Sequence, residues 1–440
     1  MAGSRLTEPV APTLERFAGF APNPEWAFAH LTQAQTNYAT HGYHRYPAKF
    51  IPQLAAKLIE DYSCWGDTIL DPFMGSGTTL VEAKRLGRQS IGVDINPVAH
   101  LVAEAKVRAL DPRILDEAIV HVWERLMSSM QPSLFSCDAP PTRNTHWHER
   151  LRYWFREDVL HTLHQIQQSF ETLEDSVQPF FRCALSHTLK PVSWWHDRSV
   201  KPTRKLSKSI PDPLQVFFKH VKRMARGNRE YWEILTAAGT LDTPVYCYCA
   251  DARALPVPDS SVDLIVTSPP YVTSYEYADL HQLSALWFQM TTNLREFRQA
   301  FIGRSNGLDE PLRDLHSPLA ERIVDQLTVR NLRKAKEVAL YFSEMYECFT
   351  HWQRVLRVGG LACIVIGNTH LNGIEVQNAQ VFAEQLQTLG FVLERVILRE
   401  IPTKILPRTR DKRTGKFAKS QDADYLAYPM EYILVLRYRG

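Results

Sequence analysis

The sequence predicts an α/β fold with a doubly wound, mostly parallel seven-stranded sheet and a largely helical inserted domain. Short apolar runs alternate with segments of helical spacing, the pattern of a parallel sheet covered by helices on both faces. Between the second and third runs, about 130 residues depart from this alternation and carry apolar residues three and four positions apart. The predicted strands are 68–70, 90–94, 245–249, 262–266, 361–366, 392–398 and 432–437.

Helices follow from the same periodicity. A helix over 79–86, closed by Gly87, joins the first two strands into a βαβ unit. The other predicted helices are 114–130, 149–173, 177–189, 341–356 and 376–389.

The length of 440 residues exceeds one typical domain. The first residues, rich in Pro and Ala, are expected to form a poorly ordered arm or a covering segment, with structure beginning near His41. We divide the chain into an N-terminal arm (1–40), the first half of the sheet domain (41–110), the helical insertion (111–244) and the second half of the sheet domain (245–440).

Composition indicates an ordinary globular protein, with 45% hydrophobic and 22% charged residues. No apolar run approaches the ~18 residues of a membrane span, and no basic-then-apolar signal pattern opens the chain, so we expect a cytoplasmic protein without a membrane partner. Seven scattered cysteines fit reduced thiols. The close pair Cys247 and Cys249 has no second Cys/His pair at suitable spacing, so no metal site is predicted.

Positive charge is concentrated locally, although the net charge is only +3. Residues 190–229 hold eleven Lys/Arg against two Asp, and residues 404–419 hold seven against one. Pro, Ser, Thr or Gly among these charges favour loops that face a polyanion over one long solvated helix face. The alternative is an ordinary solvated surface.

The tetrapeptide from Ser268 to Tyr271, Ser-Pro-Pro-Tyr, follows an apolar run as a loop leaves a buried strand. Two prolines fix the backbone and remove two N–H donors, so the neighbouring carbonyls are available acceptors. The Ser268 hydroxyl adds an acceptor, and Tyr271 offers a flat face for stacking. Such a loop suits an amino group on an aromatic ring; the alternative is a stiff strand exit with a packing tyrosine.

A second loop, from Asp71 to Thr79, ends the first strand and opens a helix. Gly75 and Gly77 allow close approach of a ligand, and the helix N-terminus presents N–H groups. Asp94 closes the next strand, where a carboxylate can accept both hydroxyls of a ribose. The spacing is neither that of dinucleotide sites nor that of nucleotide triphosphatases, and the leading acid suits the ammonium of an amino acid joined to adenosine. That ligand is S-adenosylmethionine.

These motifs in this order resemble the amino-methylating DNA methyltransferases (N4-cytosine and N6-adenine), most closely the N4-cytosine branch, over residues 41–110 and 245–440. Within these ranges, the segments His44–Pro52, Gly92–Pro97 and Asp251–Leu255 also match the pattern of the family. It implies a Rossmann-like S-adenosylmethionine-dependent methyltransferase. The implied cofactor-binding residues are Tyr46, Lys49, Phe50, Asp71, Phe73, Gly75, Gly77, Thr78, Thr79, Asp94, Ile95, Asp251 and Ala252, and the implied catalytic residues are Ser268, Pro269, Pro270 and Tyr271. Strand-end caps and local turns are the structural alternatives for the acids and Thr78.

The expected reaction is site-specific methylation of the exocyclic N4 amine of cytosine in double-stranded DNA, with base flipping and direct in-line attack. Serine before Pro-Pro-Tyr favours cytosine over adenine by resemblance. No Pro-Cys dipeptide is present, in agreement with a reaction that needs no cysteine nucleophile. The insertion is the candidate target-recognition region. The candidate DNA contacts are Arg198, Lys201, Arg204, Lys205, Lys208, Arg408, Arg410, Lys412 and Arg413.

Alternatives remain open at this level. They are an N6-adenine DNA methyltransferase, a methyltransferase of RNA or of a protein glutamine, and a non-catalytic DNA-binding regulator with a vestigial pocket. A restriction-modification or epigenetic role, nucleoid association and a partner endonuclease acting on the same site are also expected from the resemblance.

Overall fold

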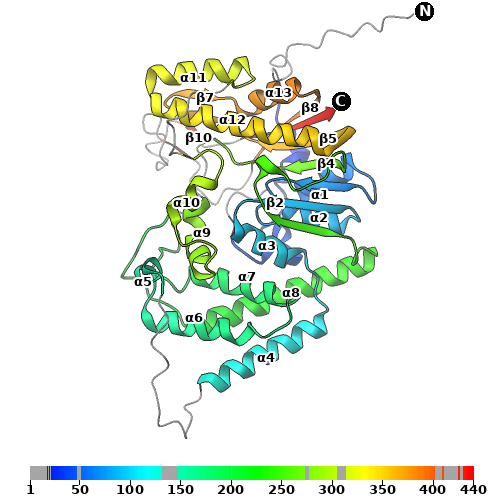
Figure 1. Cartoon of the computed structure of the whole chain (residues 1–440). Coiled ribbons are helices and arrows are strands. Elements are labelled where there is room, and N and C mark those ends of the chain that lie inside the picture. Colours follow the sequence, from blue (N-terminus) through cyan, green and yellow to red (C-terminus); the bar gives the residue numbers. More distant parts are fainter. Residues whose placement is uncertain are drawn as a thin grey trace, which may run out of the picture. The chain divides into compact units, whose positions relative to one another are not determined.

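The computed structural model of the chain describes residues 17, 19, 21–46, 51–130, 147–199, 201–272, 277–304, 314–401, 409–410, 425–426 and 430–440. Seven strands form a sheet in the order β3-β2-β1-β4-β5-β11-β8 (Figure 1). Pairs β3/β2, β2/β1 and β4/β5 are parallel, whereas β11 is antiparallel to β5 and β8. The bounds are β1 Thr68–Asp71, β2 Gln89–Asp94, β3 Val245–Cys249, β4 Val262–Thr267, β5 Leu356–Ile366, β8 Phe391–Glu400 and β11 Met430–Tyr438. The predicted seven-stranded, mostly parallel sheet is confirmed.

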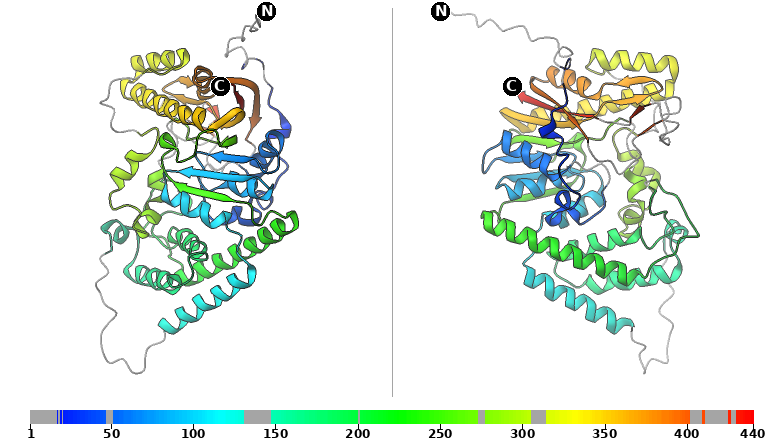
Figure 2. Two further views of the ribbon diagram at one scale, coloured as in Figure 1. Left: turned by 45° about the vertical axis from the view of Figure 1, so that its right-hand side comes forward. Right: turned by 180° about the vertical axis from the view of Figure 1, so that it is seen from behind.

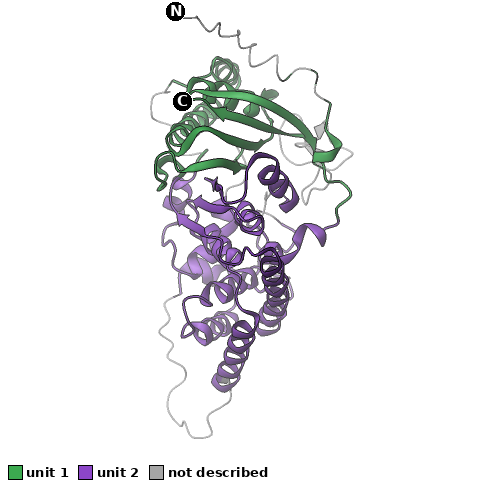
Figure 3. Cartoon of the chain, turned by 90° about the vertical axis from the view of Figure 1, so that its right-hand side faces the viewer, with its two compact units in different colours: residues 1–31, 252–274, 302–440 green, residues 32–251, 275–301 purple. Residues whose placement is uncertain are grey.

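The chain divides into two compact units (Figure 3). Unit 1 comprises residues 1–31, 252–274 and 302–440, and unit 2 comprises residues 32–251 and 275–301. Strands β1 to β3 belong to unit 2, and β4, β5, β8 and β11 belong to unit 1.

Unit 2 begins its sheet with a βαβ arrangement of β1, α2 (Thr78–Arg85) and β2, flanked by α1 (Pro52–Tyr62) and α3 (Pro97–Val107). The parallel register pairs Asp71 with Gly92 and Asp94 with Cys249. Because parallel strands end at the same edge of a sheet, the acids that close β1 and β2 emerge on one side of it.

The rest of unit 2 is helical. Its helices are α4 (Pro112–Met130), α5 (Glu149–Trp154), α6 (Glu157–Phe170), α7 (Gln178–Leu189), α8 (Pro213–Ala238), α9 (Tyr277–Trp287) and α10 (Leu294–Ala300). Helices α6, α7 and α8 pack together, and α7 also packs on α3 (Figure 2). Leu163, Phe181 and Phe217 are fully buried between these helices, in an apolar core that also includes Val102 of α3 and Leu283 of α9.

Two sequence predictions in this segment are corrected. The basic stretch 190–229 was predicted to be loops, but α8 starts within it at Pro213, capped by the Asp212 side chain. Phe217, Val221 and Met224 are buried at helical spacing, while the basic residues between them face outward. The predicted helix 149–173 is interrupted at Phe155, whose extended backbone turns its ring into the core.

The N-terminal segment also takes up structure earlier than His41. Within unit 1, Trp26 is 1% exposed, the Asn23 N–H donates to the Leu398 carbonyl (2.8 Å), and Arg399 Nε donates to the Trp26 carbonyl (2.8 Å). Residues 21–31 therefore cover the end of β8, because a buried tryptophan outweighs the disorder expected from a Pro- and Ala-rich composition.

Unit 1 packs helices on its strands. These are α11 (Pro318–Arg330), α12 (Leu332–Val355) and α13 (Asn378–Thr388), accompanied by two short antiparallel pairs, β6 (Thr369–Leu371) with β7 (Ile374–Val376) and β9 (Thr409–Arg410) with β10 (Tyr425–Leu426). Phe349, Trp352 and Phe382 fill the space between α12 and α13. Among the described residues, no helix is long and apolar enough to cross a membrane.

Candidate active site

The glycine loop of unit 2 connects β1 to α2 and has the backbone that only glycine adopts without strain. Gly75 and Gly77 have φ of 47° and 74°. A Cβ on Gly77 would lie 2.9 Å from the Cβ of Ala103, and one on Gly75 would lie 3.2 Å from the Tyr46 ring. Lys106, 1% exposed, donates from Nζ to the Ser76 carbonyl (2.6 Å) and holds the loop from α3.

Asp94 is bound into this loop by both carboxylate oxygens. Its Oδ2 accepts the Gly75 N–H (2.9 Å) and its Oδ1 accepts the Asn96 N–H (2.9 Å). Burial raises the pKa of Asp94 to about 6 despite these bonds, and the nearby charge of Asp71 adds to the rise. Asp71 is 2% exposed, and its Oδ1 accepts the Phe73 N–H (3.1 Å). The loop thus presents two carboxyl groups at the ends of neighbouring strands, and the charge of Asp71 raises the pKa of Asp94.

Two buried hydroxyls at the start of α2 support the presence of a polar ligand. In the described part of the chain, Ser76 Oγ and Thr78 Oγ1 have no hydrogen-bond partner. Buried polar atoms of this kind are normally paired. With the N–H groups of the first turn of α2 and the carboxylate of Asp71, they fit the amino-acid end of S-adenosylmethionine, and Asp94 fits its ribose hydroxyls.

Tyr46 lies over this loop and contacts a histidine that the motifs did not reveal. The ring centroids of Tyr46 and His281 are 4.9 Å apart. The Asn96 Oδ1 accepts from Val98, so its Nδ2 donates to His281 Nδ1 (2.7 Å), and the proton of the neutral ring is on Nε2. Burial lowers the pKa of His281 to about 3, and its Nε2 has no partner among the described residues. Asn96 was recognisable as a cap before Pro97, whereas His281 has no sequence signal.

The remaining predicted cofactor residues are placed as follows. Asp251 follows β3 by two residues in unit 2, beyond the Asp94–Cys249 register pair, and the Ala250 N–H donates to the Asp94 carbonyl (3.1 Å). Thr79 is buried in the first turn of α2, Phe73 is in the loop and Ile95 follows Asp94. Ala252 opens a 3-10 helix of unit 1. Lys49 and Phe50 are outside the described residues.

The Ser-Pro-Pro-Tyr loop of unit 1 leaves the end of β4, as predicted, and is held by distant side chains. Tyr341 Oη of α12 donates to the Pro270 carbonyl (2.7 Å). Tyr271 Oη donates to Glu431 Oε1 (2.8 Å), and Glu431 Oε2 pairs with Arg399 Nη1 (2.9 Å). Burial, reinforced by Glu431 and opposed by a hydrogen bond with Ser268, raises the pKa of Tyr271 well above its ordinary value.

The ring of Tyr271 also lies close to the backbone of Gly367. A Cβ on Gly367, at the end of β5, would lie 3.0 Å from Tyr271 Cε2. Pro269 is buried beside it, Ser268 and Tyr271 are half-buried, and the phenol is uncharged and hydrogen-bonded to Glu431. Sequence reasoning missed this series of hydrogen bonds, which runs from Tyr271 through Glu431 and Arg399 to the Trp26 carbonyl.

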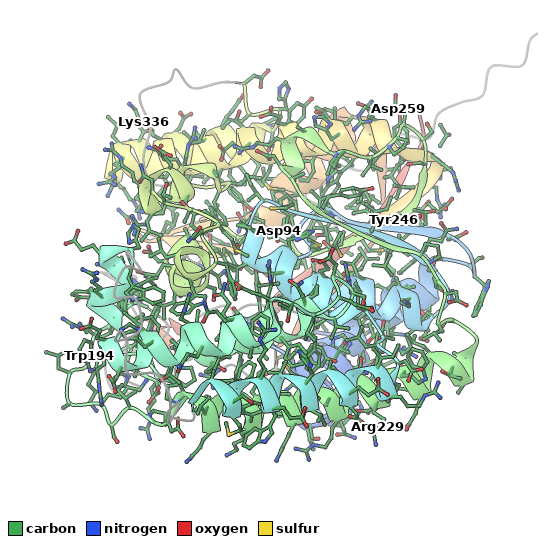
Figure 4. The ribbon with its side chains drawn as sticks, turned by 60° about the horizontal axis from the view of Figure 1, so that its bottom comes forward. Asp94, Trp194, Arg229, Tyr246, Asp259 and Lys336 are labelled. Carbon is green, nitrogen blue, oxygen red and sulfur yellow. The ribbon has the colours of Figure 1, made fainter. Side chains whose placement is uncertain are left out.

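The predicted DNA contacts differ in their surroundings. Arg198, Lys201 and Lys205 are exposed in the segment between α7 and α8. Lys208 is not free to meet phosphate, because its Nζ pairs with Asp197 (2.8 Å) and its side chain is 7% exposed. Arg204 is half-buried against aromatic rings. Arg408, Lys412 and Arg413 are outside the described residues, and Arg410 ends β9. Figure 4 shows Asp94 well separated from Trp194 and Arg229 within unit 2.

Comparison with known proteins defines the class. The chain matches the model of the DNA methylase family, the N6 and N4 methyltransferases, over residues 19–105 and 262–439, more than half of its length, and belongs to that family. It is a DNA methyltransferase that modifies a base amino group, and S-adenosylmethionine is its cofactor, as predicted.

Individual relatives are similar over much of the chain. It is 26% identical over 423 residues to the type II methyltransferase M.MvaI of Kocuria varians, covering 91% of this chain and 92% of that protein. It is 27% identical over 301 residues to the type II methyltransferase M.BsoBI of Geobacillus stearothermophilus, covering 61% of this chain and 56% of that one. A solved S-adenosylmethionine-dependent methyltransferase from Methanosarcina mazei has 10% identity over 90% of this chain and 98% of its own, with a TM-score of 0.30.

Among the described residues, no group of three His, Cys, Asp or Glu side chains could hold a metal ion.

Proposed function

We propose that this chain methylates the exocyclic N4 amine of cytosine at a specific sequence in double-stranded DNA. The Ser-Pro-Pro-Tyr loop carries the proposal, because its stiff backbone and its hydroxyl offer acceptors for the two hydrogens of an amine. The choice of cytosine depends on serine at position 268, by resemblance to the N4 branch. The two type II relatives support a site-specific reaction.

Each residue of the loop has a separate task in this proposal. Ser268 Oγ and the Pro269 carbonyl accept the amine hydrogens, which draws the nitrogen toward sp³ geometry and frees its lone pair for direct attack. Tyr271 stacks on the base after it has flipped out of the duplex, with its phenol oriented by Glu431. When bound, S-adenosylmethionine supplies an electrophilic methyl group.

In unit 2, the proposed role of the glycine loop is to bind the cofactor. The N-terminus of α2, Thr78 and Asp71 would hold its amino-acid end, and Asp94 would accept hydrogen bonds from its ribose. Tyr46, Lys49, Phe50, Asp251 and Ala252 complete the proposed set.

Residues 111–244 are proposed to recognise the DNA target, with the protein acting at the nucleoid in the cytoplasm. We also propose a restriction-modification role, which the type II names of the two relatives support, and a partner endonuclease that cuts the same site. If so, DNA from cells expressing the chain resists that endonuclease.

The decisive experiment expresses the chain in cells that lack DNA methylation and analyses the nucleosides of their DNA by mass spectrometry. N4-methylcytosine is expected, and sequencing that detects the modified base gives the target site. N6-methyladenine alone would reject the cytosine assignment, while methylated RNA or protein without methylated DNA would reject the DNA substrate. Cells that carry the vector without the gene serve as the control.

A further inference from the structure

Residues 194–199 and 201–205 of unit 2 pair as an antiparallel hairpin that the sequence did not predict. Trp195 and Arg204 form an antiparallel bridge. The His196 N–H donates to the Thr203 carbonyl (2.8 Å), and the Lys205 N–H donates to the Trp194 carbonyl (2.8 Å). This two-stranded ribbon carries five of the predicted polyanion contacts on or next to it.

The hairpin is anchored at its base. Trp195 is 1% exposed and stacks on Trp154 with ring centroids 5.1 Å apart, and the Trp194 N–H donates to the Trp154 carbonyl (2.8 Å). Lys208 donates to the Trp195 carbonyl (3.0 Å) while it pairs with Asp197. The ribbon is therefore a preorganised element, which lowers the entropic cost of binding through it.

Arg204 has an unusual environment on this ribbon. Its guanidinium carbon lies 4.2 Å from the centroid of Tyr153 and 4.5 Å from that of Trp194. Its Nε is buried without a hydrogen-bond partner, and no carboxylate among the described residues pairs with it. Aromatic faces attract the cation but accept none of its N–H groups in the usual way. An arginine held close to two rings without a carboxylate partner is suited to an acceptor supplied by a ligand.

We propose that Arg204 reads a guanine in the major groove of the target DNA. A two-stranded ribbon fits that groove, and the fixed planar fork of arginine matches the O6 and N7 acceptors of guanine. The exposed Arg198, Lys201 and Lys205 contact phosphates, which position the duplex without specifying its sequence. The inference rests on the proposed role of residues 111–244 in DNA recognition.

The test compares Arg204→Lys with Lys205→Ala, a control one residue away on the same ribbon. Binding is measured for the target duplex, for duplexes with each G·C pair replaced, and for duplexes with 7-deazaguanine at each guanine, which lacks the N7 acceptor. For Arg204→Lys we expect roughly 5- to 150-fold weaker target binding with little change for unrelated DNA, and loss of discrimination at one G·C pair. Lys205→Ala should weaken both kinds of DNA alike and lower the salt slope by about 1.

Wild-type protein with 7-deazaguanine duplexes keeps the test independent of folding defects in the variants. At one guanine of the target, replacement by 7-deazaguanine should weaken binding of the wild-type protein and leave binding of the Arg204→Lys variant unchanged. Uniform weakening of all duplexes by Arg204→Lys would make Arg204 a phosphate contact and overturn the inference. If methylation is normal and discrimination is unchanged, this inference alone fails, whereas a wild-type chain that methylates no DNA also defeats the proposed function.

Discussion

The two loops proposed to carry the reaction are built in opposite ways. The glycine loop of unit 2 derives its shape from neighbours in sequence: Gly75 and Gly77 turn the backbone, and Asp94 closes the next strand and binds the Gly75 N–H. The Ser-Pro-Pro-Tyr loop of unit 1 depends on remote side chains, since the partner of Tyr271 is Glu431, 160 residues away. The supports of the first loop, including Lys106 on Ser76, therefore lie within about 30 residues of it, whereas the support of the second loop comes from much farther along the chain.

The largest expected effect comes from removing the remote support of Tyr271. Glu431→Ala would leave Arg399, whose side chain is 4% exposed, without its carboxylate, and we expect a loss of about 3–5 kcal/mol in the free energy of unfolding. Glu394→Ala is the control, because its pair with Arg437 is about one-third exposed and should cost only about 0–1 kcal/mol. Urea unfolding measures both. Equal losses in the two variants would show that the buried Glu431–Arg399 pair contributes no more to stability than the exposed Glu394–Arg437 pair.

The next effect concerns catalysis. Ser268→Ala removes one proposed acceptor of the amine and should lower the methylation rate by about 10²–10³-fold, the usual cost of one transition-state hydrogen bond. Cofactor affinity, measured by calorimetry, should be unchanged because the glycine loop is intact. Ser261→Ala, at the other end of β4, should retain full activity. A Ser268→Ala variant with the wild-type rate would remove this residue from the mechanism.

Gly77→Ala tests the local loop. The left-handed backbone costs an alanine about 1–2 kcal/mol. Because the new Cβ would also meet the Ala103 Cβ at 2.9 Å, we expect the loss of stability to exceed this backbone cost, and cofactor binding to weaken. Gly239→Ala has a similar φ of 67° with nothing within 4 Å and isolates the backbone cost. Thermal unfolding with and without cofactor separates the two effects. If both variants behave alike, close packing of the loop is unimportant.

The smallest effect is a pH dependence from Asp94. Ribose hydroxyls bind the ionised carboxylate, so cofactor affinity should be constant above pH 6 and fall up to tenfold per pH unit below it, because the pKa is about 6. Calorimetry across pH 5–8 measures this, and Asp94→Asn should abolish the dependence. Without ligand the sign reverses: the folded state holds this proton more tightly than the unfolded chain, so the contribution of Asp94 to stability falls as pH rises from 3.8 to about 6. A flat affinity profile for the wild type would argue against a ribose contact.

Sequence reasoning reached the strands and the glycine loop because their signals are contiguous. Asp71 and Asp94 end apolar runs, and Gly75 and Gly77, just before a predicted helix start, indicate a loop that a ligand can approach closely. It missed α8, where dense positive charge obscured the buried spacing of Phe217, Val221 and Met224. It also treated Arg204 and Lys208 alike as DNA contacts, although Arg204 lies close to aromatic rings and Lys208 pairs with Asp197.

By itself, the sequence determined the α/β class, the order of strands along the chain and the acid-led glycine loop, since periodicity and short motifs act over neighbouring residues. Only the tertiary structure revealed the partners of distant residues: His281 with Asn96, Glu431 with Tyr271, and the rings that flank Arg204. Such contacts depend on which chain segments pack together, and a side chain gives no local sign of a partner more than a hundred residues away.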